Sequence, residues 1–135
     1  MKRIICLLAL LLITSLNISA KDNSATTSEQ VKATQKFLPM RIDDNTTWVE
    51  IAGSKNSLIY FYQINDISDQ QVKDAHSSIK NSVQTKLKDA YANNKGFAQL
   101  ADKGVNFTYI YVNGNDDFIT SFTFTPAEFN WFVEV

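Results

Sequence analysis

The chain has 135 residues, with 13 Lys and Arg against 14 Asp and Glu, a formal net charge of −1 and one cysteine. This length suits a single domain, and an aromatic content of 12% is too high for a disordered chain. No basic segment is present, so nucleic acid is not an expected partner.

Residues 1–20 have the three parts of a secretory signal peptide: a basic start, an apolar run over residues 4–16 and a small-residue end. The alternative is a membrane anchor, but the run is well short of the roughly 20 residues that span a bilayer. We expect cleavage after Ala20, which also removes Cys6, the only cysteine. The product would be periplasmic or secreted, without disulfides and without membrane contact.

The first part of the exported chain predicts a flexible leader over residues 21–38, with a possible short helix from Ser28 to Leu38. A single α+β domain is expected over residues 39–135. It begins with two strands, Thr47–Ile51 and Leu58–Ile64, which can pair as a hairpin.

After these strands the spacing of the apolar residues changes from two to three and four, which indicates a helix. Ser68 and Gln71 match a capping box, and apolar residues recur at spacings of three and four from Asp69 to about Asn94. This predicts one long amphipathic helix. A short second helix is expected over residues 97–103.

Two further strands, Val105–Val112 and Phe118–Thr125, flank the turn-forming residues 113–117. The tail alternates apolar and other residues over 129–135 and predicts a possible further strand. The order is α-β-β-α-β-β(-β), and we expect an antiparallel sheet of four or five strands with the long helix on one face.

Candidate catalytic residues are few. His76 is the only histidine and lies on the apolar stripe of the long helix, where a structural role is the more common outcome. The acidic pairs Asp43-Asp44 and Asp116-Asp117 could serve a hydrolase or bind a cation, but both lie in turn-like segments that favour Asp for its geometry. We therefore assign no catalytic, cofactor-binding or metal-binding residue, and expect no cofactor.

Strand aromatics allow two interpretations. They could form a platform on which sugars or bases stack, or the core of a sheet packed on a helix; the core is favoured. The residues concerned are Tyr60, Tyr62, Phe107, Tyr109 and Tyr111.

Several short segments together resemble a family of small exported bacterial proteins of unassigned function. They are Leu38-Pro39, Ile42-Asp43, Thr46 or Thr47, Leu58–Tyr62, Leu100, Gly104-Val105, Tyr109–Tyr111 and Thr125-Pro126. The resemblance implies a Cys near the end of the long helix and another near the C-terminus, where this chain has Ala90 or Tyr91, and Phe129. It implies no catalytic residues. A fainter similarity, in element order alone, is to periplasmic type II secretion pilotins, and fold by itself does not give function.

These observations predict an exported, non-enzymatic protein that binds another envelope or secreted protein, in an accessory, chaperone-like or immunity role. The alternatives are a small periplasmic hydrolase and a small-ligand carrier that uses the aromatic sheet face. An apolar cavity between helix and sheet would favour the carrier, and converging carboxylates would favour the hydrolase.

Overall fold

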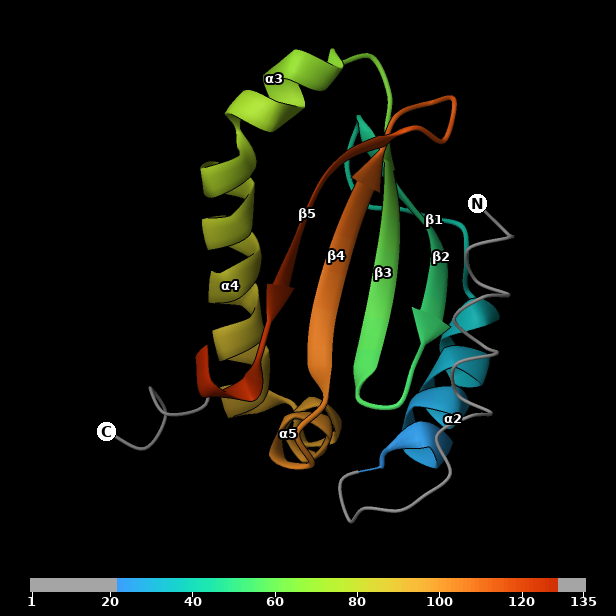
Figure 1. The fold of residues 1–135 in the computed structure, drawn as a ribbon, viewed down its shortest axis with the longest axis vertical. Coiled ribbons are helices and arrows are strands. Elements are labelled where there is room, and N and C mark those ends of the chain that lie inside the picture. Colours follow the sequence, from blue (N-terminus) through green and yellow to red (C-terminus); the bar gives the residue numbers. More distant parts are fainter. Residues whose placement is uncertain (1–21, 129–135) are drawn as a thin grey trace.

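The computed structural model describes residues 22–128, which form an open five-stranded sheet with helices (Figure 1). The strands lie in the order β1-β2-β3-β4-β5 and are Met40–Arg41, Thr46–Gly53, Ser57–Ile64, Asn106–Val112 and Phe118–Phe124. The helices are α2 Ser24–Gln35, α3 Asp69–Asp74, α4 His76–Asn93 and α5 Lys95–Asp102, and a 3-10 turn covers Pro126–Glu128. The α+β class and the strand number are as predicted.

The sheet is mixed, which corrects the expectation of a purely antiparallel sheet. β3 pairs with β4 in parallel, with Tyr60 opposite Tyr109 and Tyr62 opposite Tyr111, while the other three pairings are antiparallel. The helical connection between β3 and β4 returns the chain to the end of the sheet where β3 began, and such a crossover is what parallel neighbours need.

The fifth described strand is β1, a two-residue edge strand beside β2 that the sequence patterns did not predict. It is too short to show a period of two, and its two residues are exposed. The predicted strand at 129–135 lies outside the described residues.

The long predicted helix is divided at Ala75, which ends α3 and precedes α4 with φ −90° and ψ 6°. The capping box of Ser68 and Gln71 at the start of α3 is confirmed. Alanine favours helix, so the sequence gives no sign of this bend. The bend allows Val72 of α3 to be buried at one end of the core while α4 runs along the sheet (Figure 1).

The N-terminal helix starts and ends earlier than predicted and is part of the core. Thr27 is fully buried, and its hydroxyl donates to the Ser54 carbonyl at 2.8 Å. A Cβ at Gly53 would lie 3.1 Å from Val31, so glycine permits the close approach of α2 to β2. Residues 24–35 are therefore a helix packed on the sheet, where the sequence predicts a flexible leader with a possible short helix over residues 28–38.

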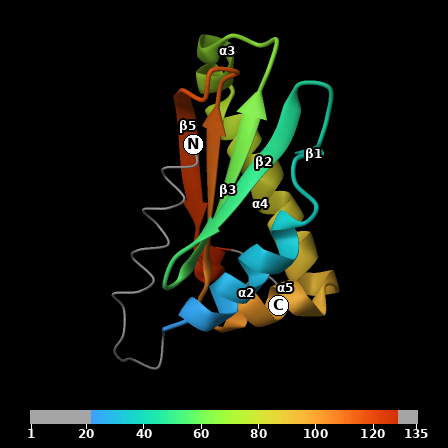
Figure 2. The same ribbon diagram turned by 90° about the vertical axis from the view of Figure 1, so that its right-hand side faces the viewer.

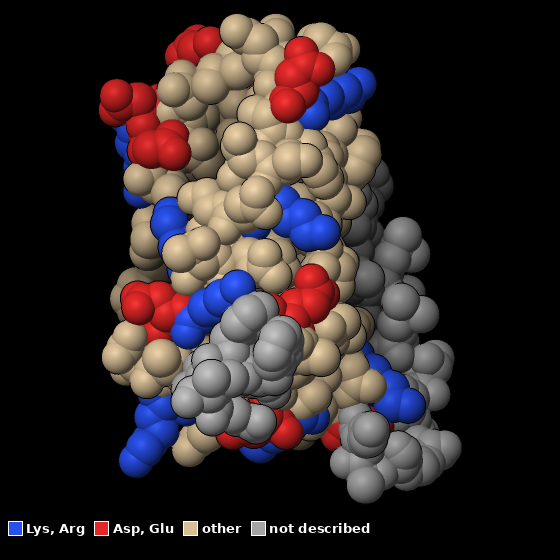
Figure 3. Space-filling view, turned by 90° about the vertical axis from the view of Figure 1, so that its left-hand side faces the viewer, with Lys and Arg blue, Asp and Glu red and all other residues tan. Residues whose placement is uncertain are grey.

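The helices α2, α4 and α5 lie on the same side of the sheet (Figure 2). The main core cluster joins Val31, Val83, Leu87 and Phe97 of these helices to strand residues such as Phe107. A smaller cluster on the other face contains Ala52, Ile59 and Phe61, packed with Val49 and Ile110. Strand β3 thus has apolar residues buried on both of its faces. On the side of the molecule that carries α4, acidic and basic side chains are interspersed (Figure 3).

Candidate functional site

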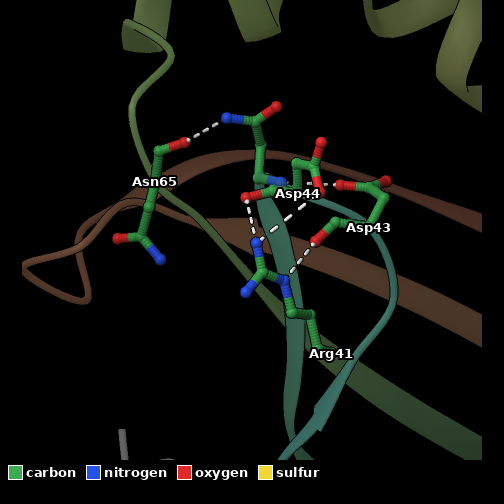
Figure 4. A network of polar contacts seen from close by, with 5 residues as sticks. Arg41, Asp43, Asp44 and Asn65 are labelled. Carbon is green, nitrogen blue, oxygen red and sulfur yellow. Dashed lines mark hydrogen bonds and ion pairs between the residues drawn. The ribbon is translucent and has the colours of Figure 1, made fainter.

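The first acidic pair holds a turn before β2 (Figure 4). The Asp43 carboxylate accepts from the Asn45 backbone N–H at 2.9 Å, and this bond is the main reason why the pKa of Asp43 is lowered. Arg41 donates to the backbone carbonyls of both aspartates and lies 3.6 Å from the Asp44 carboxylate. These contacts explain the Asp pair as a turn former.

The second acidic pair lies in the exposed β4–β5 loop. The Asn113 side-chain oxygen accepts from the backbone N–H groups of Asn115 and Asp117, and its amide donates to the Asp69 carboxylate. Asp116 has a positive φ of 66°, a conformation that Asp tolerates better than most residues. Within residues 22–128, no group of three or more His, Cys, Asp or Glu side chains could hold a metal ion.

His76 stands at the start of α4 against β5. Its Nδ1 lies 2.7 Å from the Thr120 hydroxyl, and its ring meets Phe122 edge-on at 5.6 Å. Both contacts tie helix to sheet, which is the structural role that its place on the apolar stripe predicted.

The tyrosines of β3 and β4 stack on one another across the sheet. Tyr60 and Tyr109 have ring centroids 4.9 Å apart with 9° between their planes, and Tyr62 and Tyr111 are 5.4 Å apart. Tyr62 also lies 5.7 Å from Tyr109, with 5° between the planes. Because the ring faces cover each other, they are not presented to a base or a sugar, and the core interpretation is the better one. What the rings present toward the helices is their edges and hydroxyls.

A groove of about 360 Å³ lies between α4 and this face of the sheet. Its volume is within the ~300–1,000 Å³ of small-molecule sites. Its polar floor is formed by Tyr62, Tyr109 and Tyr111. Its aliphatic walls come from Ile42, Ile64, Ile79 and Val83.

The groove continues toward α3 as a second hollow of about 450 Å³. Asp43, Ile64 and Ile79 line both hollows, and Val72 and Ala75 line only the second. The first hollow thus contains the three tyrosines, and the second combines apolar side chains with the polar residues Asp43, Asp44, Asn45, Thr46 and Gln71.

Two tyrosines on the floor have buried side chains whose hydroxyls bond to no residue among 22–128. Tyr109 and Tyr111 are only 8% and 6% exposed. Within residues 22–128 neither hydroxyl makes a hydrogen bond, although both oxygens retain accessible surface. Burial raises the pKa of Tyr111 to about 12, with the charge of Asp43 acting in the same direction, and burial also raises the pKa of Tyr109. Both groups therefore remain protonated donors at neutral pH.

Lys86 and Asp43 supply the charges of the groove. Lys86 is an exposed residue of α4, and its positive charge contributes to the lowered pKa of Asp43. Within the described part of the chain, Lys86 forms no ion pair at salt-bridge distance. The groove thus has a cation on α4, tyrosine hydroxyls on the sheet, and the Asp43 carboxylate, whose lowered pKa keeps it charged.

A second surface feature is a cluster of exposed apolar residues where α2 leads into β1. Phe37 is 67% exposed, Met40 40% and Ile42 45%. Ile42 also forms part of the groove wall. The sequence patterns predict neither the cluster nor the groove, because both depend on how the segment between α2 and β1 lies in the folded chain. Of the exposed cluster, only Ile42 belongs to the segments that carry the family resemblance, where it is followed by Asp43 of the groove.

Comparison with solved structures shows the same fold in exported and secretion-associated proteins. A candidate secreted protein of Pseudomonas aeruginosa, PA3611, has a TM-score of 0.65 at 18% identity, covering 83% of this chain and 98% of that one. The type II secretion pilotin EpsS of Vibrio vulnificus has a TM-score of 0.58 at 14% identity, and AspS of Vibrio cholerae has 0.55 at 12%. Each pilotin match covers 80% of this chain and 94% of the pilotin. At these identities the likeness shows the fold, and it confirms the resemblance drawn from the sequence.

No curated protein sequence matches the chain. None of the helices described within residues 22–128 is long and apolar enough to span a membrane. A family profile matches residues 21–119, which is most of the chain. The chain therefore belongs to the family described as a domain of unknown function, DUF8479.

Proposed function

We propose that this protein is exported through the signal peptide of residues 1–20 and acts outside the cytoplasm as a non-enzymatic protein that binds another envelope or secreted protein. The fold is shared with a candidate secreted protein and with two secretion pilotins, which supports this class of function. The two acidic pairs belong to turns and His76 ties helix to sheet, so the hydrolase alternative has less support than the binding protein.

The observation that carries the proposal is the exposed cluster of Phe37, Met40 and Ile42. Three large apolar side chains are exposed within six residues of the chain, and exposed apolar surface of this kind marks interaction sites. Arg41 lies among them with a largely exposed side chain, and Phe, Met and Arg are enriched in protein interfaces. The partner would bury this patch, in an accessory, chaperone-like or immunity role.

The docking prediction compares two exposed phenylalanines. We expect Phe37→Asp and Met40→Asp to remove capture of a partner from envelope extract, because each places a charge in the buried centre of the interface. Phe118→Asp is the matched control, since Phe118 is similarly exposed but lies on β5 at the opposite edge of the sheet. Tagged exported protein and quantitative mass spectrometry of the captured material provide the measurement. A partner retained equally by all variants would contradict this docking surface, provided that their thermal melts agree.

The export prediction concerns the mature N-terminus. Mass spectrometry of the periplasmic fraction or medium should find a chain that begins at Lys21 and carries no acyl group. Ala20→Phe should block processing because the cleavage site needs small residues, whereas Ile18→Ala should leave it intact. Recovery of full-length or acylated wild-type chain in membranes would contradict the prediction.

A further inference from the structure

The face of the sheet that points away from α2, α4 and α5, here called the outer face, is apolar and buried. Phe61 at its centre is fully buried, and Ala52 and Ile59 are nearly so, with Val49 and Ile110 packed against them. A sheet face that meets water carries polar residues at alternate positions. The outer face therefore has the composition and the burial of a face with a cover.

No helix described within residues 22–128 lies on the outer face. The helices α2, α4 and α5 are on the other side of the sheet (Figure 2), and Val72 of α3 belongs to the core cluster on that side. The remaining residues of the chain are 1–21 and 129–135. A cover from within this chain must therefore come from one of these two ends.

The two ends of the described chain leave the fold in different places. Asn23 donates its backbone N–H to the Lys55 carbonyl at 3.0 Å, so the N-terminal end is fixed at the loop that joins β2 to β3, at one end of the outer face. The Glu128 carbonyl accepts from the Gln84 side chain of α4 at 3.4 Å, on the side of the sheet that the helices cover. The residues before 22 are thus the ones that begin beside the outer face.

The apolar run of residues 4–16 matches the outer face in length, width and charge. Its 13 residues would extend about 20 Å as a helix, against about 26 Å for the eight residues of β3. A helix is about 10 Å across, which is close to two strand spacings of about 4.8 Å, so one helix can cover the apolar residues of β2, β3 and β4. Glu50 is the only charged residue in β2–β5, so little charge would be buried beneath the run.

We propose that residues 4–16 dock as a helix along β3 on the outer face of the folded precursor, and that cleavage after Ala20 uncovers this face. An uncovered apolar sheet face marks an interaction site, so processing would create a docking surface separate from the cluster of Phe37, Met40 and Ile42. The docking of the run is independent of the proposed function. The uncovering of the face rests on its export step, because only cleavage removes the run from the chain.

Cys6 provides the test, because it lies within the run and is the only cysteine of the chain. It is ten positions from Leu16, which corresponds to about 15 Å along a helix. Gln63 alternates with Phe61 on the outer face and lies six residues beyond the start of β3 at Ser57, about 20 Å along the strand. Docking of the run along β3 therefore brings residue 6 close to Gln63.

The experiment treats the uncleaved Ala20→Phe chain with diamide, which oxidises two neighbouring thiols to a disulfide. Gln63→Cys should cross-link to Cys6, which mass spectrometry of the non-reduced tryptic digest detects. Ser77→Cys is the matched control and should not cross-link, since Ser77 is an exposed residue of α4 on the other side of the sheet. Cross-linking of both introduced cysteines to equal extents, or of neither, would overturn the proposal.

A second measurement follows the reaction of Cys6 with a maleimide and needs no added cysteine. In the native Ala20→Phe chain, Cys6 should react more slowly than in urea by roughly tenfold or more, because the docked run must open before it reacts. Ile110→Lys should remove this protection by placing a charge beneath the run, whereas Ser77→Lys should leave it unchanged. Thermal melts of both variants without residues 1–20 ensure that the domain itself is folded.

The remaining outcomes separate this inference from the proposed function. Fast reaction of Cys6 in a native chain that sediments as a dimer would overturn the docking and assign the outer face to a second copy. Protection of Cys6 together with an exported chain that keeps residues 1–20 would support the docking and overturn the uncovering step, along with the export prediction on which that step rests.

Discussion

Replacing Phe107 with alanine is expected to lower the free energy of unfolding by about 3–5 kcal/mol, the usual range for removing a buried aromatic ring. Phe107 is fully buried on the interior strand β4, opposite Leu58 on β3 and Phe124 on β5. Its ring centroid lies 4.8 Å from that of Phe97 on α5, so the cavity would open where helix and sheet meet. Because a domain has only about 5–15 kcal/mol of stability, this variant should approach the limit of folding.

Urea denaturation followed by circular dichroism measures the change. Phe118→Ala is the control with the same chemistry, because Phe118 is 62% exposed and its loss should change stability by no more than about 0.5 kcal/mol. Equal effects of the two substitutions would contradict the assignment of Phe107 to the core.

Deleting residues 129–135 is expected to be at least as damaging, on the evidence of the sequence pattern. Phe129, Trp131, Val133 and Val135 alternate with other residues, which predicts a half-buried strand, and this segment lies outside the described residues. If the strand is integral, the deletion removes two large aromatic side chains from the core, at about 3–5 kcal/mol each. The truncated protein should then be unfolded or strongly destabilised.

A thermal melt of the truncated exported protein checks this expectation. The matched control is Asn130→Ser with Glu134→Gln, which changes the other set of alternating positions and should leave the midpoint nearly unchanged. An unshifted midpoint after truncation would mean that the tail contributes nothing to the core, and the tail would then become the segment to test for partner binding.

Local pattern was sufficient to predict most of the elements. The residues of Leu58–Ile64 predicted the strand, and the Ser68–Gln71 pair predicted the start of the helix. These features depend on residues within a few positions of one another, where side-chain period and capping chemistry act directly. The structural role of His76 was also predictable, since its position on an apolar stripe placed it against the sheet.

Tertiary structure alone decided the mixed sheet, the bend at Ala75, the strand β1 and the groove. Whether β4 runs parallel to β3 depends on the path of about 40 intervening residues, and no local period records that path. The groove joins Ile42, Tyr62, Lys86 and Tyr109, which come from four separate segments of the chain. No local pattern records this arrangement, because the residues that line the groove meet only when α4 packs against the sheet.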